Sequence, residues 1–404
     1  MTSPPGTLLD PATLQDPYPF LTRLREHEPV WRVPSTTLHL VTSRDAVVEA
    51  LGRVADFSSN LEALLYTSDD GSPAMFDMTT LGTNIQTLAT ADPPAHTMHR
   101  RAVFPSLVEA RMRGVEGYAR TVAAGLVTRS VAQGRVDITT SFTNPLPMTV
   151  LVEVLGLHGA HVPTLIEWAF DSTELLAGTS SLARMAELAA RAGETGAYLG
   201  EHLARTEPDP AAGLVGAVAR GVADGLLTAE EGVSTLVILL SAGGESTTSL
   251  IGSAIRILAE QPALQDTLRA DPGLIPSFVE EVARLESPFK GHYRTVRRAT
   301  QLAGVSLDAG ATLILCWGAA NRDATHFDHA DDVRLDRPSP RDHLAFGRGI
   351  HHCVGAPLAR MEARVALEEL LARTSFFALD PQRPPAYVPS ILVRRHAHLD
   401  LVLS

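Results

Sequence analysis

The sequence predicts an α+β protein that is mainly helical, with a smaller strand-rich part. Three observations predict this class: helical apolar spacing dominates from residue 94 onward, one helical stretch is long enough to cross a domain, and strand-like runs with turn signals follow residue 285. Residues 61–92 are rich in Gly, Ser, Thr and Asp, and we expect them to form a long functional loop. In chain order, the expected elements are strand 38–41, helices 46–51, 115–131, 147–157, 181–205, 229–261 and 274–285, strands 293–298, 300–306 and 312–317, and helix 356–371.

The composition fits one globular domain over residues 1–404. The 404 residues are 45% hydrophobic, which excludes a disordered chain, and no internal repeat or low-complexity linker divides them. The formal net charge of −12 argues against a nucleic-acid binder. No apolar run approaches the roughly 20 residues of a membrane span, and no signal-peptide pattern is visible, so we expect a cytoplasmic protein without membrane contact. Lys290 is the only lysine among 34 basic residues.

The stretch 229–261 is the most informative helix, with an expected length of about 50 Å. Thr228 is its expected N-cap, and the acids at 230 and 231 suit the positive helix end. Glycine and polar residues at 243–248 interrupt its buried centre, at a cost on the order of 1 kcal/mol for each glycine relative to alanine. Two explanations stay open: a local helix distortion beside a ligand, which we favour, or a close helix crossing.

The segment 343–355, HLAFGRGIHHCVG, carries the strongest signal for chemistry. A thiolate metal ligand needs backbone N–H groups directed at sulfur and a close approach of the chain, and Gly347, Gly349 and Gly355 permit both. The helix expected at 356–371 would stabilise a negative sulfur at Cys353 through its N-terminal dipole.

Other interpretations of the two cysteines stay open. Cys353 could be a small buried apolar residue, or a zinc ligand with its neighbours His351 and His352, although no second ligand pair at a zinc spacing exists. The other cysteine is Cys316. Two cysteines in so long a chain favour a reducing compartment, and a single disulfide between them stays open.

The run Phe346-Gly347-x-Gly349-x-His351-x-Cys353-x-Gly355 resembles the haem-binding loop of the cytochrome P450 family, with six fixed residue types at fixed spacing. The resemblance extends from about residue 16 to the C-terminus. It implies the P450 fold, haem b as cofactor, and Cys353 as the axial thiolate ligand of the iron. Because it uses up the chain, it also implies a single haem domain with no fused reductase or ferredoxin domain.

Further segments match the family. Glu281-Val-Ala-Arg284 resembles its ExxR helix, in which a carboxylate and a guanidinium at i, i+3 share a face, and Arg337 matches the third member of that charge network. Residues 319–323 resemble the family's ANRDP stretch, with alanine in place of proline at 324. The family also implies haem propionate contacts, for which basic side chains suit carboxylates: His96, Arg100, Arg294 and His351.

Residues 242–247, AGGEST, resemble the distal-helix pattern of the family. The pattern implies Ala242 as a haem contact, and Glu245 and Ser246 as the acid and hydroxyl that deliver protons to dioxygen. Serine replaces the usual threonine and lacks the methyl group that restricts the side-chain rotamer. Thr247 and Thr248 are therefore candidates to share the role.

The resemblance implies a haem-thiolate monooxygenase that inserts one oxygen atom from O2 into a small or medium apolar organic substrate. Electrons would come from NAD(P)H only indirectly, through a separate ferredoxin and ferredoxin reductase. A peroxide-using haem enzyme and a non-catalytic haem- or ligand-binding module of a biosynthetic assembly are the alternatives, and the Glu245–Ser246 pair favours the dioxygen route. An acidic ferredoxin would dock on arginines near the cysteine loop: Arg341, Arg348, Arg360 and Arg364.

Position in the family also implies a substrate pocket. If residues 289–294 are extended, alternation places Lys290, His292 and Arg294 on one side, which would suit an oxygenated or acidic substrate. We favour the simpler alternative, in which Lys290 points to solvent and His292 bonds to backbone or to a propionate. The implied pocket residues are Ile238, Ser241, Phe289, His292, Tyr293 and Ile391.

Overall fold

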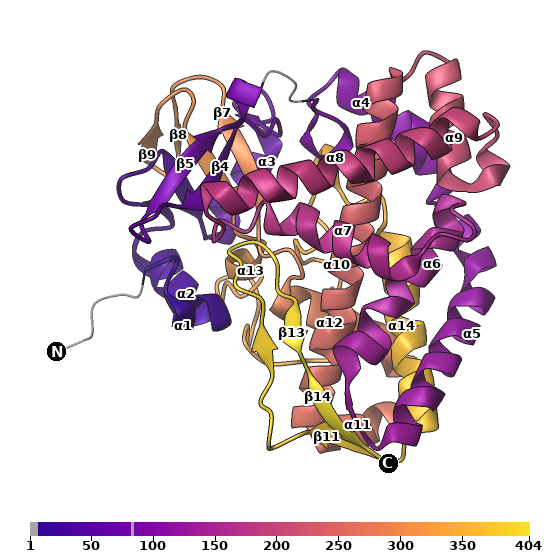
Figure 1. The fold of residues 1–404 in the computed structure, drawn as a ribbon. Helices are drawn as coiled ribbons and strands as arrows, with labels where there is room; N and C mark the ends of the chain where they lie inside the picture. The colour runs from indigo at the N-terminus through magenta and orange to yellow at the C-terminus, as the bar shows by residue number, and fades with distance from the viewer. Residues whose placement is uncertain (1–6, 82–84) are drawn as a thin grey trace.

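The computed structural model describes residues 7–81 and 85–404. Helix α10 runs through a mainly helical molecule, and the short strands from the first part of the chain gather at one side above α1 and α2 (Figure 1). The predicted α+β class with dominant helices is confirmed. The helices are α1 Pro11–Gln15, α2 Tyr18–His27, α3 Arg44–Gly52, α4 Ala95–Val103, α5 Glu109–Gln133, α6 Pro145–Leu155, α7 Val162–Glu174, α8 Leu182–Arg205, α9 Gly213–Ala223, α10 Ala229–Glu260, α11 Pro262–Ala270, α12 Ile275–Glu286, α13 Trp317–Ala320 and α14 Ala356–Arg373.

The largest sheet has the strand order β1-β2-β10-β7-β3, with β10 parallel to β2 and the other neighbours antiparallel. A second sheet, β11-β14-β6, joins the C-terminus to the segment after α5. The strands are β1 Val30–Arg32, β2 Leu38–Val41, β3 Phe57–Ser58, β4 Ala63–Thr67, β5 Pro73–Asp77, β6 Arg135–Asp137, β7 His292–Val296, β8 Thr300–Leu302, β9 Val305–Leu307, β10 Thr312–Leu315, β11 Phe377–Leu379, β12 Ala386–Tyr387, β13 His396–His398 and β14 Asp400–Leu403.

The expectation of a structureless loop at 61–92 is wrong for its first half. Strands β4 and β5 pair as an antiparallel hairpin, with Ala63 opposite Asp77 and Thr67 opposite Pro73. The Asp70-Gly71 pair makes the turn, since Gly71 has φ +82° and the Asp70 carboxylate accepts hydrogen bonds from Ser68 Oγ and the Ser72 N–H. Residues 82–84 lie outside the described part.

Helix α10 begins as expected, because Thr228 and Glu231 form a reciprocal capping box. The predicted distortion at 243–248 is wrong: the helix stays α-helical from Ala229 to Glu260. The glycines instead allow close helix crossings. A Cβ on Gly244 would lie 2.6 Å from Met148 Cε of α6, and one on Gly243 would lie 3.0 Å from Leu151 Cδ2. Close helix crossing therefore explains both glycines. It does not explain the polar residues beside them.

The main apolar core surrounds α10 and joins α5, α6, α12 and α14, with side chains such as Phe142, Leu240, Ile255 and Phe278 fully buried. A smaller core packs α1, α2 and hairpin β4–β5 against β2 and β10. Within residues 7–81 and 85–404, no helix is long and apolar enough to cross a membrane.

Candidate active site

Cys353 lies between a short turn of 3-10 helix and the start of α14. Its N–H donates to the Phe346 carbonyl at 2.8 Å, and positive φ values at Gly347 and Gly349 shape the loop ahead of it. Burial raises the pKa of the Cys353 thiol, while hydrogen bonds from the backbone N–H groups of Gly355 and Ala356 oppose that rise. The first turn of α14 is therefore directed at the sulfur, which suits a thiolate ligand.

The structure excludes two of the alternatives for the cysteines. Cys316 is buried elsewhere, directly after β10, and both cysteines are free, so the disulfide left open by the sequence is absent. His351 Nε2 lies 2.9 Å from Ser59 Oγ and does not converge on the sulfur with its neighbour. Over the described residues, no three His, Cys, Asp or Glu side chains are grouped to hold a metal ion.

Four basic residues from distant parts of the chain gather beside this loop. The His96 and His351 rings lie 4.2 Å apart, Arg100 Nη1 donates to the His352 carbonyl at 2.8 Å, and Arg294 acts on the pKa of His351. Helix α4 supplies two of the four and strand β7 a third. The structure thus brings together all four residues expected to contact propionates.

This cluster fits a bound anion. Burial lowers the pKa of Arg294 to about 10 and also lowers that of Arg100, and within the described part of the chain neither guanidinium forms an ion pair with a carboxylate. Burial, with nearby arginines, lowers the pKa of His351 to about 3. Asp92 offsets the burial of Arg294 only in part, and buried cations without a paired carboxylate are costly, so the arrangement suits two carboxylates such as haem propionates.

The charge network stands behind the cysteine loop. Arg284 donates from Nε and Nη2 to the two carboxylate oxygens of Glu281, each at 2.9 Å, and Arg337 Nε donates to Glu281 at 2.8 Å. Arg284 Nη1 also donates to the Asn321 carbonyl, and the Asn321 amide oxygen accepts from the Leu344 N–H at 2.7 Å. Because Leu344 precedes Phe346 by two residues, the network supports the loop directly.

On α10, the predicted residues separate onto two faces. Ala242 is exposed, and Ser246 Oγ donates to the Ala242 carbonyl at 2.6 Å. The carboxylate of Glu245 is fully buried and pairs with Arg395 Nε at 2.9 Å, while Thr173 Oγ1 donates to it at 3.2 Å. Burial raises the pKa of Glu245, and Arg395 opposes this rise.

The other two hydroxyls point elsewhere. Thr247 is buried and hydrogen-bonds with Glu362 of α14, and Thr248 Oγ1 donates to the Thr143 carbonyl at 2.9 Å. Both bonds face the helical core rather than the exposed strip of Ala242 and Ser246. Ser246 is therefore the hydroxyl beside Ala242, and a share of Thr247 or Thr248 in proton delivery stays a prediction.

The predicted pocket residues come from three parts of the chain, namely α10, residues 289–293 and residue 391. Ile238 and Ser241 lie on α10, and the Phe289 and His292 rings are 5.3 Å apart. Tyr293 instead faces hairpin β4–β5, where its hydroxyl accepts from the Leu65 N–H at 3.4 Å. Ile391 packs on the segment between α7 and α8.

The expectation that Lys290 points to solvent is wrong, and of the two contacts expected for His292 the structure leaves the propionate open. The Lys290 side chain is buried, only 4% exposed, and its Nζ donates to the Ser390 carbonyl at 2.6 Å. His292 Nδ1 accepts from Trp317 Nε1 at 2.7 Å, not from backbone. Burial and Arg294 lower the pKa of His292 to about 4, so the neutral ring carries its proton on Nε2.

Sequence reasoning missed three partners of the site. Ser59 contacts His351, Arg395 neutralises Glu245, and Trp317 sets the tautomer of His292. Each lies far from its partner along the chain. Only the contact of Trp317 with His292 had a signal in the sequence. Trp317 follows strand β10, and β10 pairs with β7, which contains His292.

Comparisons with known proteins agree with this geometry. Residues 273–398 match the family model described as Cytochrome P450. Cytochrome P450 144 of Mycobacterium tuberculosis is 40% identical over 399 residues, which cover 99% of this chain and 92% of the relative. Mycinamicin IV hydroxylase/epoxidase of Micromonospora griseorubida is 35% identical over 323 residues, covering 78% of this chain and 79% of the relative.

The fold is similar to solved structures over nearly its whole length. The crystal structure of CYP109E1 from Bacillus megaterium in complex with testosterone has a TM-score of 0.84 at 28% identity, covering 97% of this chain and 98% of that one. Together with the relatives named as hydroxylases and epoxidases, these likenesses identify an oxidoreductase. The chain belongs to the cytochrome P450 family.

Proposed function

We propose that this enzyme inserts one oxygen atom from O2 into a small or medium apolar organic molecule, using electrons from a separate ferredoxin and ferredoxin reductase. The observation that carries the proposal is the position of Cys353, directly ahead of α14 and beside a cationic cluster without carboxylate partners. When bound, haem b supplies a thiolate-ligated iron at which dioxygen is activated.

The residues of this chain hold the cofactor in distinct ways. The sulfur of Cys353 is the proposed iron ligand, and the positive-φ glycines 347 and 349 let the loop approach the ring plane. Arg100, Arg294, His96 and His351 are the proposed propionate contacts, with Ser59 holding the ring of His351. The Glu281 network fixes the loop from behind.

Proton delivery is assigned to Glu245 and Ser246. Glu245 is held by Arg395 and Thr173 on the side of α10 away from Ser246. Its raised pKa makes the carboxyl a better proton donor near neutral pH than a solvated glutamate. To pass on a proton, the Glu245 carboxyl must first separate from Arg395, so the ion pair controls the transfer. Ser246 can rotate from the Ala242 carbonyl to relay that proton.

Electron transfer needs a partner on the cysteine-loop side. Of the four expected docking arginines, Arg360 pairs with Glu280 and Arg364 pairs with Glu116 and Glu368. Arg341 Nε also lies 3.4 Å from Glu280 Oε1, but its side chain is three-quarters exposed, and Arg348 is exposed next to the exposed Ile350. We therefore assign docking of an acidic ferredoxin chiefly to Arg341 and Arg348. Because NAD(P)H enters through such partners, we place the reaction in the cytoplasm.

The alternative routes make different demands on the same residues. A peroxide-driven enzyme needs no delivered protons, and a non-catalytic binding module needs neither Glu245 nor Ser246. Turnover of a substrate library with reduced ferredoxin and with hydrogen peroxide separates them. We expect product with ferredoxin and O2 and little with peroxide; product with peroxide alone, or with neither, contradicts the proposal.

A further inference from the structure

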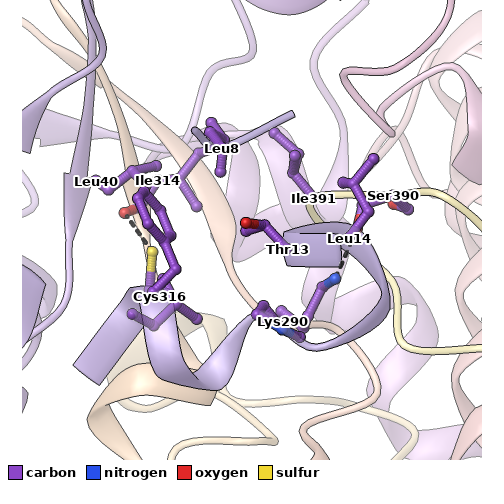
Figure 2. Close-up of a pocket in the computed structure, with 12 residues that line it drawn as sticks. Leu8, Thr13, Leu14, Leu40, Lys290, Ile314, Cys316, Ser390 and Ile391 are labelled. Carbon is purple, nitrogen blue, oxygen red and sulfur yellow. Dashed lines mark hydrogen bonds between the residues drawn. The ribbon is translucent and has the colours of Figure 1, made fainter. Parts of the chain in front are cut away.

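The only lysine of the chain lies inside the protein. Lys290 lines a cavity of about 30 Å³ together with Thr13, Leu14 and Cys316, and Figure 2 shows its amine directed at Ser390. Within the described residues no carboxylate pairs with it, and burial together with Arg394 lowers its pKa to about 7. Glu286 opposes this shift without pairing with the amine, and a buried lysine without an ion-pair partner is rare.

Lys290 holds one short segment at two points. Its Nζ donates to the Ser390 carbonyl at 2.6 Å, and its backbone N–H donates to the Leu392 carbonyl at 2.6 Å. Within the segment, Ser390 Oγ accepts from the N–H groups of Leu392 and Val393. The Lys290 side chain therefore supplies one of the contacts that fix residues 390–393 and with them the direction of Ile391.

The segment 390–393 packs against residues 175–181, which connect α7 to α8. The Ile391 N–H donates to the Ala177 carbonyl at 2.9 Å, and Thr179 Oγ1 donates to the Pro389 carbonyl at 2.9 Å. Gly178 presses on Ile391 so closely that a Cβ there would lie 2.9 Å from Ile391 Cδ1.

Hairpin β4–β5 also packs against residues 175–181. The Thr67 N–H donates to the Ser180 carbonyl at 3.0 Å, and Thr67 Oγ1 donates to the Gly178 carbonyl at 3.1 Å. Residues 175–181 are thus held between the segment that carries the expected pocket residue Ile391 and the hairpin in the expected functional loop. If residues 175–181 separate from these two segments, four hydrogen bonds to carbonyl oxygens break. Each bond contributes only modestly to stability in water.

We propose that Lys290 is a positioning residue of the substrate pocket, whose amine fixes the Ser390 carbonyl so that Ile391 clamps residues 175–181 against hairpin β4–β5. The clamp sets how long a pocket ligand stays bound. A lysine suits this place because its long apolar stem crosses the cavity, and its amine donates a hydrogen bond whether neutral or charged. The inference rests on the proposed function only in taking Ile391 as a pocket residue.

The test compares the holoenzyme with Lys290→Met, which keeps the side-chain volume and removes the donor. Cys316→Ala is the matched control, because it alters the same cavity without touching the Ser390 carbonyl. We expect Lys290→Met to speed hydrogen exchange at the Ile391 amide about three- to tenfold and to speed dissociation of the probe 4-phenylimidazole by a similar factor, with no such change in Cys316→Ala. Equal exchange and dissociation in Lys290→Met and wild type overturn the proposal.

A measurement on the unaltered chain covers the case in which Lys290→Met does not fold. With a single lysine, acetylation at residue 290 by an N-hydroxysuccinimide ester reports exposure of that amine alone. We expect 4-phenylimidazole to slow this acetylation and the Ile391 amide exchange by the same factor. Rapid acetylation while Ile391 stays protected overturns the clamp. Neither readout needs oxygenase turnover, so a failure of the proposed function is recognised separately by a missing product.

Discussion

Arg395 Nε lies 2.9 Å from Glu245 Oε1, which joins the C-terminal part of the chain to the middle of helix α10. The carboxylate is fully buried and the guanidinium is mostly buried. The pair therefore neutralises the one acid of the distal pattern, and proton supply depends on a residue 150 positions away.

Replacing Glu245 by Gln should lower ferredoxin-driven turnover about 100-fold, because a positioned proton donor typically increases the rate by about that factor or more. The amide keeps the shape of the side chain but supplies no acidic proton. Turnover per electron delivered is the measurement, with Glu260→Gln at the end of the same helix as control. Peroxide-driven turnover should change far less. Equal losses on both routes would assign Glu245 a structural role only.

Replacing Arg294 by Met should have opposite effects on the protein with and without haem. Without haem, removing a buried cation that lacks a carboxylate partner should raise the free energy of unfolding by about 1–3 kcal/mol. With haem, losing one charge-assisted contact to a propionate should speed haem release roughly tenfold. Urea unfolding of the apoprotein and haem transfer to apomyoglobin measure the two effects. A variant that is less stable without haem and also releases haem faster would contradict the propionate assignment. So would a variant that is more stable without haem and releases haem more slowly.

Reversing the charge of exposed arginines beside the cysteine loop should weaken ferredoxin docking. For Arg348→Glu combined with Arg341→Glu, we expect KM for ferredoxin to rise at least about tenfold at low salt and the difference to shrink as salt increases. Arg205→Glu, an exposed position at the end of α8, is the matched control. A salt-independent loss, or the same loss in the control, would count against this docking face.

The stability of the protein should depend on pH through Lys290. Its pKa is lowered from 10.5 to about 7 in the folded state, so between these values the unfolded chain binds more protons. Relative to Lys290→Met, wild-type stability should therefore rise with pH across this window, by at most about 1.4 kcal/mol per pH unit, and stay level below pH 7. Denaturant unfolding at a series of pH values measures the difference. Parallel profiles would show that the amine is solvated.

The parts of the site that sequence reasoning placed well are local. The Cys353 loop, the Glu281–Arg284 pair and the Thr228 cap each involve residues a few positions apart, where spacing alone fixes which groups meet. Hairpin β4–β5 also had a local signal in Asp70-Gly71, but the Gly, Ser, Thr and Asp residues around its short strands masked them.

The parts that failed depend on tertiary contacts. Burial of Lys290 requires α1 and residues 390–393 to close over it, although lysine ordinarily stays in solvent. The partner of Glu245 and the direction of Thr247 follow from how α10 packs against Arg395 and Glu362. No periodicity in a single chain encodes these contacts.

The central claim is that Cys353 is the thiolate ligand of a haem held by the cationic cluster, and the reduced carbon monoxide difference spectrum tests it most directly. The account predicts a thiolate-type Soret band for the wild-type protein, lost in Cys353→Ser and kept in Cys316→Ser. A wild-type protein that binds haem but shows only the band of a neutral or nitrogen ligand, or a Cys353→Ser variant that keeps the thiolate band, would contradict it.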